Sequence, residues 1–157
     1  MIFVTVGAQM PFDRMVKAVD DWAASRGRAD VFAQIGPADY EPRHLDWTRF
    51  LEPDDFLSRY RASKVIVAHA GTGSILQALE LGKPILVMPR RAALRETRND
   101  HQVATAERFQ ALGVPVAWDA ADLATALDGL DGLSSDRTLG PHASPQLVAR
   151  IRRFLDE

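Results

Sequence analysis

Residues 65–84, VIVAHAGTGSILQALELGKP, constrain the fold more than any other segment of this chain. The apolar residues 65–68 predict a strand that is buried on both faces. A histidine, two glycines and two hydroxyl residues follow, and a helical pattern then runs over 75–81 to the stop signal Gly82-Lys83-Pro84. A strand, a glycine-rich turn and a helix start present free backbone N–H groups and the positive end of a helix dipole, which suits a phosphate.

The rest of the chain repeats this alternation of strand and helix. We expect further strands at 2–6, 31–35, 45–51, 85–88 and 114–118. We expect helices from Asp13, as N-cap, from Pro53, and over 100–112, 120–130 and 144–155. The strands are continuous apolar runs, which is typical of a parallel sheet with helices on both faces. The sequence therefore predicts an α/β, Rossmann-like fold, and its length of 157 residues fits one domain.

Composition excludes several classes of function. The net charge of −2 argues against a nucleic-acid partner, and the absence of cysteine excludes disulfides and thiolate metal sites. No His-rich or paired-carboxylate pattern indicates a metal site. No apolar run approaches the roughly 20 residues that span a bilayer, and the N-terminus MIFVTVGAQ lacks signal-peptide features. We therefore expect a cytoplasmic protein.

Ligands of parallel α/β sheets bind at the carboxyl ends of the strands, where the glycine turn lies. Gly71 and Gly73 would let a phosphate approach the backbone, and Thr72 or Ser74 would cap the helix or bond a phosphate oxygen. Gln77, expected in the first helical turn, would also point its amide toward the mouth of this site. A structural alternative stays open, in which the glycines only form a tight turn and the serine only caps the helix.

Other polar residues fall on the same edge. Glu96, Asp100, His101 and Gln102 lie between the strand 85–88 and the next helix, and the last three are candidates to bond sugar or ribose hydroxyls; helix capping by Asn99 or Asp100 is the alternative. Gly7, Ala8 and Gln9 follow the first strand and would otherwise form a plain turn. His69 would otherwise be a structural hydrogen-bonding residue. Arg90, Arg91, Arg95 and Arg98 form a basic loop for a diphosphate, an anionic lipid or an acidic partner, unless the loop is simply solvated.

Three stretches in this order resemble the C-terminal, nucleotide-sugar-binding half of family 28 glycosyltransferases: MIFVTVGAQMPFDRMVKAVD, AHAGTGSILQALELGKPILVMPR and NDHQVATAERFQALG. The resemblance runs from Met1 to about Val116. Within the family the chain is most similar to stand-alone subunits of split enzymes. One type serves bacterial exopolysaccharide synthesis, as a glucuronosyltransferase subunit, and the other extends a dolichol-linked sugar in eukaryotes. The start MIFVTVGAQMPFDR and the Asn-Asp-His-Gln motif favour the bacterial type.

The resemblance implies the donor half of a GT-B enzyme, one nucleotide-sugar-binding domain over 1–157 with a C-terminal helix at 144–157. It implies a UDP-sugar donor and no cofactor or metal. A membrane-associated partner subunit would bind a lipid-linked saccharide acceptor, recruit this chain to the inner face of the membrane and supply the catalytic base. No catalytic residue is then assigned here, and His69 and His101 are the candidates if the base instead lies in this chain. The expected substrate-binding residues are Gly7, Ala8, Gln9, His69, Gly71, Thr72, Gly73, Ser74, Gln77, Arg90, Glu96, Asp100, His101 and Gln102.

By the same resemblance, Gly71–Ser74 would face the diphosphate, Asp100–Gln102 the sugar, and Gly7–Gln9 would line the floor of the donor cleft. Two positions depart from the family pattern, which usually has Glu at Gln77, bonding the ribose hydroxyls, and Thr at Ala8. The departure at Gln77 favours a competing hypothesis, a non-catalytic accessory subunit that activates or anchors a partner glycosyltransferase. An unrelated nucleotide-binding regulator is disfavoured by the three ordered motifs.

Overall fold

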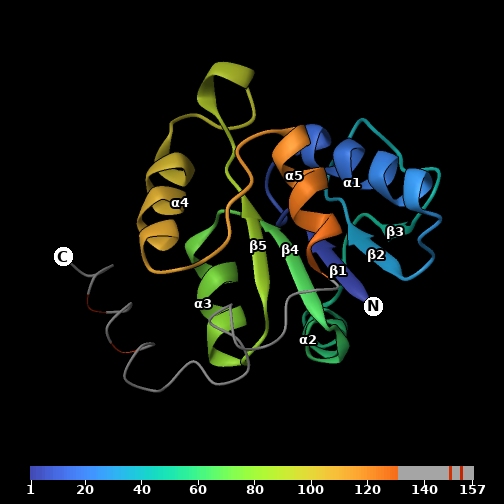
Figure 1. Cartoon of the computed structure of the whole chain (residues 1–157), viewed down its shortest axis with the longest axis horizontal. Helices are drawn as coiled ribbons and strands as arrows, with labels where there is room; N and C mark the ends of the chain where they lie inside the picture. The colour runs from blue at the N-terminus through green and yellow to red at the C-terminus, as the bar shows by residue number, and fades with distance from the viewer. Residues whose placement is uncertain (131–148, 150–152, 154–157) are drawn as a thin grey trace.

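The computed structural model describes residues 1–130 together with positions 149 and 153. One parallel sheet has the strand order β3-β2-β1-β4-β5 (Figure 1). Its strands are β1 (Ile2–Thr5), β2 (Val31–Gln34), β3 (Asp46–Thr48), β4 (Val65–His69) and β5 (Ile85–Met88). The helices are α1 (Asp13–Arg26), α2 (Pro53–Ala62), α3 (Thr72–Glu80), the short 3-10 helix η1 (Ala92–Leu94), α4 (His101–Ala111) and α5 (Ala120–Asp128). The predicted α/β class is confirmed.

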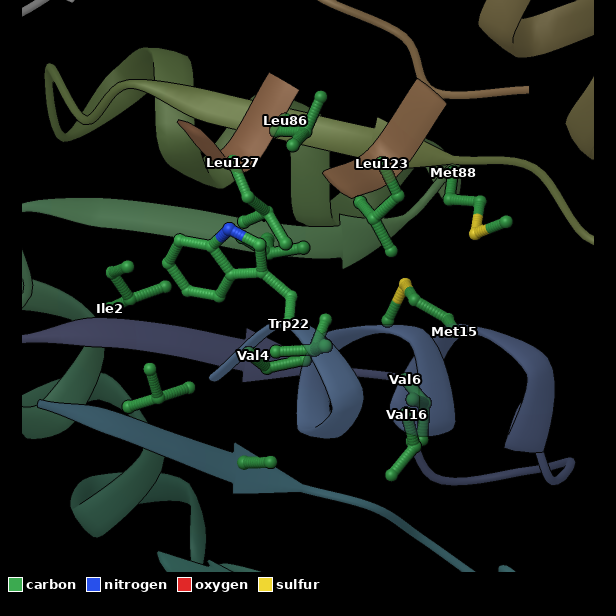
Figure 2. Packing of buried hydrophobic residues seen from close by; sticks show 14 of the residues in the cluster. Ile2, Val4, Val6, Met15, Val16, Trp22, Leu86, Met88, Leu123 and Leu127 are labelled. Carbon is green, nitrogen blue, oxygen red and sulfur yellow. The ribbon is translucent and has the colours of Figure 1, made fainter. Parts of the chain in front are cut away.

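Helices cover both faces of the sheet because successive strand side chains point to opposite sides. On one face, α1 and α5 pack against the strands, and Trp22, Leu123 and Leu127 close this core (Figure 2). On the other face, α2, α3 and α4 pack around Phe3 and Ile66. Burial on both faces explains why the strands read as continuous apolar runs.

Tyr60 of α2 links the second core to the start of α3. Its ring packs edge-on against Phe3, with the ring centroids 6.1 Å apart, and next to Phe56 at 5.6 Å. Its hydroxyl donates a hydrogen bond of 2.8 Å to the carbonyl oxygen of Ser74. Burial raises the pKa of the Tyr60 phenol, so the hydroxyl keeps its proton and stays a donor. The first turn of α3 is therefore held in place from the aromatic core.

The strand order reverses between β1 and β4. From β1 the chain proceeds outward to β2 and β3, and it then returns to place β4 and β5 on the other side of β1. Thr5 pairs with Ala68, and His69 pairs with Met88, so the segments that follow β1, β4 and β5 leave the same edge side by side. In open α/β sheets this topological switch point is where ligands bind.

The structure corrects the expected strand at 114–118. Only Val116 bridges to Val87 of β5, and no strand forms among the residues described there. The Val87 N–H donates to the Pro115 carbonyl at 3.1 Å, and the Ala117 N–H donates to the Val87 carbonyl at 2.8 Å. Pro115 has no N–H to donate, which limits the ladder at this position.

Two helix starts also differ from expectation. Asp13 is the first residue of α1 rather than its N-cap, a position that Phe12 occupies, and the Asp13 carboxylate accepts from the Asp39 N–H at 3.3 Å. The third helix begins at Thr72, three positions before the apolar pattern begins at Ile75, because its first turn is made of small and polar residues. The expected C-terminal helix, 144–157, lies outside the described residues except at two positions.

Candidate functional site

The start of α3 lies at the switch point of the sheet. Gly71 occupies the N-cap position with extended backbone angles, and no side chain caps the helix. Within residues 1–130, nothing accepts a hydrogen bond from the N–H groups of Thr72, Gly73 or Ser74. The alternative in which Thr72 or Ser74 caps the helix is therefore wrong. Three unpaired N–H groups at the positive end of a helix make a binding position for an anion.

Two glycines leave room for the ring of His69, the last residue of β4, between the turns that follow β1 and β4. A Cβ added at Gly71 would lie 2.3 Å from His69 Cε1, far inside contact distance. A Cβ at Gly7 would lie 3.1 Å from His69 Nε2, and Gly7 also has a φ of +77°, which disfavours other residues. Gly73 faces open space, and a Cβ added there would have no neighbour within 4 Å. Gly7 and Gly71 are thus needed to make room for the histidine ring. Gly73 has no such neighbour, and the space next to it is open.

His69 is held by hydrogen bonds on both ring nitrogens. Its Nδ1 lies 3.1 Å from Gln102 Nε2 and 3.5 Å from Arg90 Nη1, and its Nε2 lies 3.3 Å from Ser74 Oγ. Burial and the adjacent Arg90 charge lower the pKa of His69 to about 4. The ring is therefore neutral near pH 7, and a weak base. The structural alternative for His69 describes these contacts well.

Arg90 is buried beneath the site, with 6% of its surface exposed. Its Nη2 donates to the carbonyls of Val6 and Met10, both at 2.6 Å, and its guanidinium lies over the Phe12 ring. The Nε has no hydrogen-bond partner among the described residues. Arg90 therefore fixes the loop after β1 and places a positive charge below the start of α3. The solvated-loop alternative is wrong for this arginine.

Glu96 anchors the loop after β5 to α1. Its two carboxylate oxygens accept from Arg14 Nε at 2.6 Å and Nη2 at 3.0 Å, and one also accepts from the Arg91 N–H at 3.0 Å. Arg14 also donates to the Pro89 carbonyl at 3.1 Å. These partners give Glu96 a structural role, and its contact with substrate stays a prediction. Sequence reasoning missed Arg14, although it stands inside the first motif, MIFVTVGAQMPFDR.

The remaining predicted residues surround this centre. Ala8, Gln9 and Asp100 are exposed on the loops after β1 and β5, and His101 is exposed as the first residue of α4. The Asp100 carboxylate accepts from the Ala92 N–H at 2.9 Å. Gln77 is half-buried and lies in the second turn of α3 rather than the first, because the helix begins at Thr72. The structure thus brings the residues after β1, β4 and β5 to one edge, and it sets Gln77 further along the helix.

The low pKa of His69 predicts a specific dependence of stability on pH. The folded state keeps the ring neutral down to about pH 4, whereas an unfolded histidine binds a proton below about pH 6.5. Between these values the unfolded state binds more protons, so the free energy of unfolding falls as the pH falls. We expect His69 to contribute about 2 kcal/mol to the loss between pH 7 and pH 5. Urea titrations of the wild type and of His69→Gln at pH 7 and pH 5 would measure this loss of the free energy of unfolding. Equal losses in the two proteins would contradict the prediction.

The part of the chain that the structure describes contains neither a cluster of metal-ligating side chains nor a membrane-spanning helix. In residues 1–130, no group of three or more His, Asp or Glu side chains is placed to hold a metal ion. No helix in the same part of the chain is both long and apolar enough to cross a bilayer.

A parallel sheet in this strand order, with the unpaired N–H groups of a helix start at its switch point, defines a Rossmann-like domain equivalent to the C-terminal half of a GT-B glycosyltransferase. A family model, glycosyltransferase family 28 C-terminal domain, matches residues 1–131. The chain therefore belongs to this family, as the sequence resemblance indicated.

The chain is similar to subunits named UDP-N-acetylglucosamine transferase subunit ALG13. It is 40% identical to the Eremothecium gossypii protein over 82 residues, which is 51% of this chain and 36% of that protein. It is 36% identical to the Saccharomyces cerevisiae protein over 76 residues, or 48% of this chain and 34% of that protein. The matched segment thus spans only about a third of each of these relatives.

Solved structures share the fold. The solution structure of ALG13 matches with a TM-score of 0.64 at 20% identity, covering 98% of this chain and 94% of that one. The glycosyltransferase SnogD from Streptomyces nogalater matches with a TM-score of 0.57 at 20% identity, covering 99% of this chain and 39% of the enzyme. At this level of identity the likeness establishes the architecture alone.

Proposed function

We propose that this chain is the donor-binding, catalytic subunit of a two-component inverting glycosyltransferase that uses a UDP-sugar. The observation that carries the proposal is the start of α3, where three backbone N–H groups lack acceptors within residues 1–130. It lies at the switch point of a family 28 domain. The relatives are named as UDP-N-acetylglucosamine transferase subunits, which makes a uridine diphosphate sugar the donor class to test first.

The proposed reaction displaces UDP from the sugar. An acceptor hydroxyl attacks the anomeric carbon, the bond from that carbon to the β-phosphate oxygen breaks, and the hydroxyl proton passes to a base. The departing diphosphate gains negative charge, which the N–H groups and dipole of α3 and the buried charge of Arg90 would stabilise without a metal. The low pKa of His69 makes it a poor base, so we assign the base to the partner subunit.

The proposed partner is a membrane-associated subunit that binds a lipid-linked saccharide acceptor at the cytoplasmic face. Ala8, Gln9 and His101 are exposed at the carboxyl edge of the sheet, where a second half would close over the donor. The large apolar side chains Leu94, after β5, and Phe50, after β3, are also about half exposed there. Synthesis of an exopolysaccharide or glycolipid is the setting that we propose.

The position of Gln77 favours one alternative, an accessory subunit with a weakened nucleotide site. An amide offers one carbonyl acceptor where a carboxylate would bond both ribose hydroxyls. Gln77 is half-buried in the second turn of α3, away from the unpaired N–H groups. Under this alternative the chain would bind its partner but not the nucleotide.

Calorimetry separates the two functions. We expect the isolated chain to bind UDP and UDP-N-acetylglucosamine, with affinity unchanged by EDTA, because the proposed charge stabilisation comes from the protein itself. Uridine is the matched control, since it lacks the diphosphate and is expected to bind much more weakly. Absence of heat with millimolar UDP would contradict the proposal and leave the accessory function. Loss of binding on adding EDTA would instead contradict the metal-free part.

A further inference from the structure

Gln102, His69 and Ser74 form a continuous row of hydrogen-bonded side chains from the backbone of Arg90, just after β5, to the start of α3. The Arg90 N–H donates to Gln102 Oε1 at 3.1 Å. Gln102 Nε2 lies 3.1 Å from His69 Nδ1, and His69 Nε2 lies 3.3 Å from Ser74 Oγ. Gln102 and His69 each make a hydrogen bond to the preceding group through one atom and to the following group through another.

The direction of every bond in this row follows from its first donor. A backbone N–H can only donate, so the Gln102 oxygen faces Arg90 and the Gln102 NH2 group faces His69. His69 Nδ1 must then accept, and Arg90 Nη1, another obligate donor, lies 3.5 Å from the same nitrogen. A neutral ring that accepts at Nδ1 carries its proton on Nε2. His69 therefore donates to Ser74 Oγ.

The consequence falls on the hydroxyl of Ser74. Because its oxygen accepts from His69, its own proton is free to be donated elsewhere. Ser74 is half-buried in the first turn of α3, beside the unpaired N–H groups of Thr72 and Gly73. An anion that binds these groups would meet a hydroxyl that is already oriented as a donor.

We propose that Gln102 is a positioning residue that, through His69, presents the Ser74 hydroxyl as a donor to the diphosphate. The inference rests on the proposed function for its ligand. It differs from the expectation that Gln102 contacts the sugar. If Gln102 bound the sugar directly, its replacement would weaken the binding of a UDP-sugar and leave the binding of UDP unchanged. If Gln102 acts through Ser74, its replacement weakens the binding of UDP itself.

NMR of the protein without ligand, with its histidines labelled with 15N, tests which nitrogen of His69 carries the proton. We expect His69 to show a protonated Nε2 and an unprotonated Nδ1 near pH 7, with its signals assigned by their loss in His69→Gln. In Gln102→Glu no donor faces Nδ1 from that side chain, and we expect the proton to move to Nδ1 or the ring to become doubly protonated. Gln110→Glu makes the same charge change at an exposed position of α4 and should leave the His69 signals unchanged. A wild-type ring protonated at Nδ1 would overturn the proposal.

A double-mutant cycle with UDP tests the action on Ser74. We expect Ser74→Ala to weaken UDP binding on the order of tenfold, as for a hydrogen bond to a charged group. Gln102→Met, which has similar length and no hydrogen bonds, should weaken it by roughly threefold in the wild type and leave it unchanged in Ser74→Ala. Gln110→Met is the control on the same helix. Thermal melts confirm that each variant is folded.

The outcomes separate this proposal from the proposed function. If UDP binds and Gln102→Met has the same effect with and without the Ser74 hydroxyl, the positioning role is overturned and the function stands. If the wild type binds no UDP, the proposed function is overturned, and the diphosphate role of Ser74 with it. The NMR measurement then still reports whether Gln102 sets the protonated nitrogen of His69.

Discussion

Replacing Gly71 by alanine is expected to destabilise the protein by about 2 kcal/mol and to lower its affinity for UDP more than tenfold. The new Cβ would lie 2.3 Å from His69 Cε1 and 2.9 Å from Nδ1. His69 is held at both nitrogens, so the ring cannot move without losing its bonds to Gln102 and Ser74. The backbone of Gly71 is in an ordinary extended conformation, so the effect is steric. Urea unfolding and calorimetry with UDP would measure both losses.

Gly73→Ala is the matched control, two residues away in the same turn. Nothing lies within 4 Å of its new Cβ, and alanine favours a helix over glycine, so stability should be unchanged or rise by up to about 1 kcal/mol. If the diphosphate binds at this turn, the same methyl group lowers UDP affinity. Only Gly71→Ala is therefore expected to lower the free energy of unfolding, whereas both glycine variants are expected to lower the affinity for UDP. A large loss of stability in Gly73→Ala would contradict the geometry, and unchanged UDP affinity would place the ligand elsewhere.

Glu96→Gln is expected to lower the free energy of unfolding by about 3 kcal/mol, because removing one partner leaves the other charge poorly paired. The Glu96 and Arg14 side chains are only 10% and 22% exposed, and their pair joins α1 to the loop after β5. The carboxylate also accepts from the Arg91 N–H, so the amide would lose part of that contact as well. Denaturant titration at pH 7 measures the change.

The pair of Lys17 and Asp21 gives the control for this substitution. Both side chains are more than half exposed, at 58% and 59%, and they lie one turn apart on α1. Asp21→Asn should therefore change stability by less than about 1 kcal/mol. A similar loss in Asp21→Asn and Glu96→Gln would show that the buried position of Glu96 does not matter. The same comparison in high salt should diminish only the effect of Asp21→Asn.

The fold was predictable from the sequence because its strong signals are local. Apolar runs such as 65–68 and 85–88, bounded by glycine and proline, mark strands that are buried on both faces, and the parallel sheet follows. The prediction is wrong for segments with a weaker pattern, and in one of them a single residue changes the strand pairing. Pro115 removes a donor, so 114–118 forms one bridge instead of a strand. The apolar pattern predicts the start of α3 at Ile75, three residues too late, because Thr72, Gly73 and Ser74 have no apolar periodicity.

The candidate site was only partly predictable. Its location at the carboxyl edge followed from the alternation of elements, and the structure brings Gly7, His69, Ser74 and Gln102 together there. The partners of buried charges could not be predicted, because they come from segments far apart in sequence. Arg14 and Glu96 are one such pair, and no local pattern joins them.

The central place of β1 in the sheet affects how the protein reaches its native state. Ile2 pairs with Val31 on one side and with Val65 on the other, so the middle of the sheet is completed only by distant segments. Parallel neighbours cannot be joined by a tight hairpin, and the entropy of closing both loops is lost before the contacts stabilise the chain. Folding should therefore be slower than in a helical bundle of similar length, and β1 should acquire its protection from hydrogen exchange late. The loops after β1 and β4, where we propose that the donor binds, then form only when nearly the whole sheet has assembled.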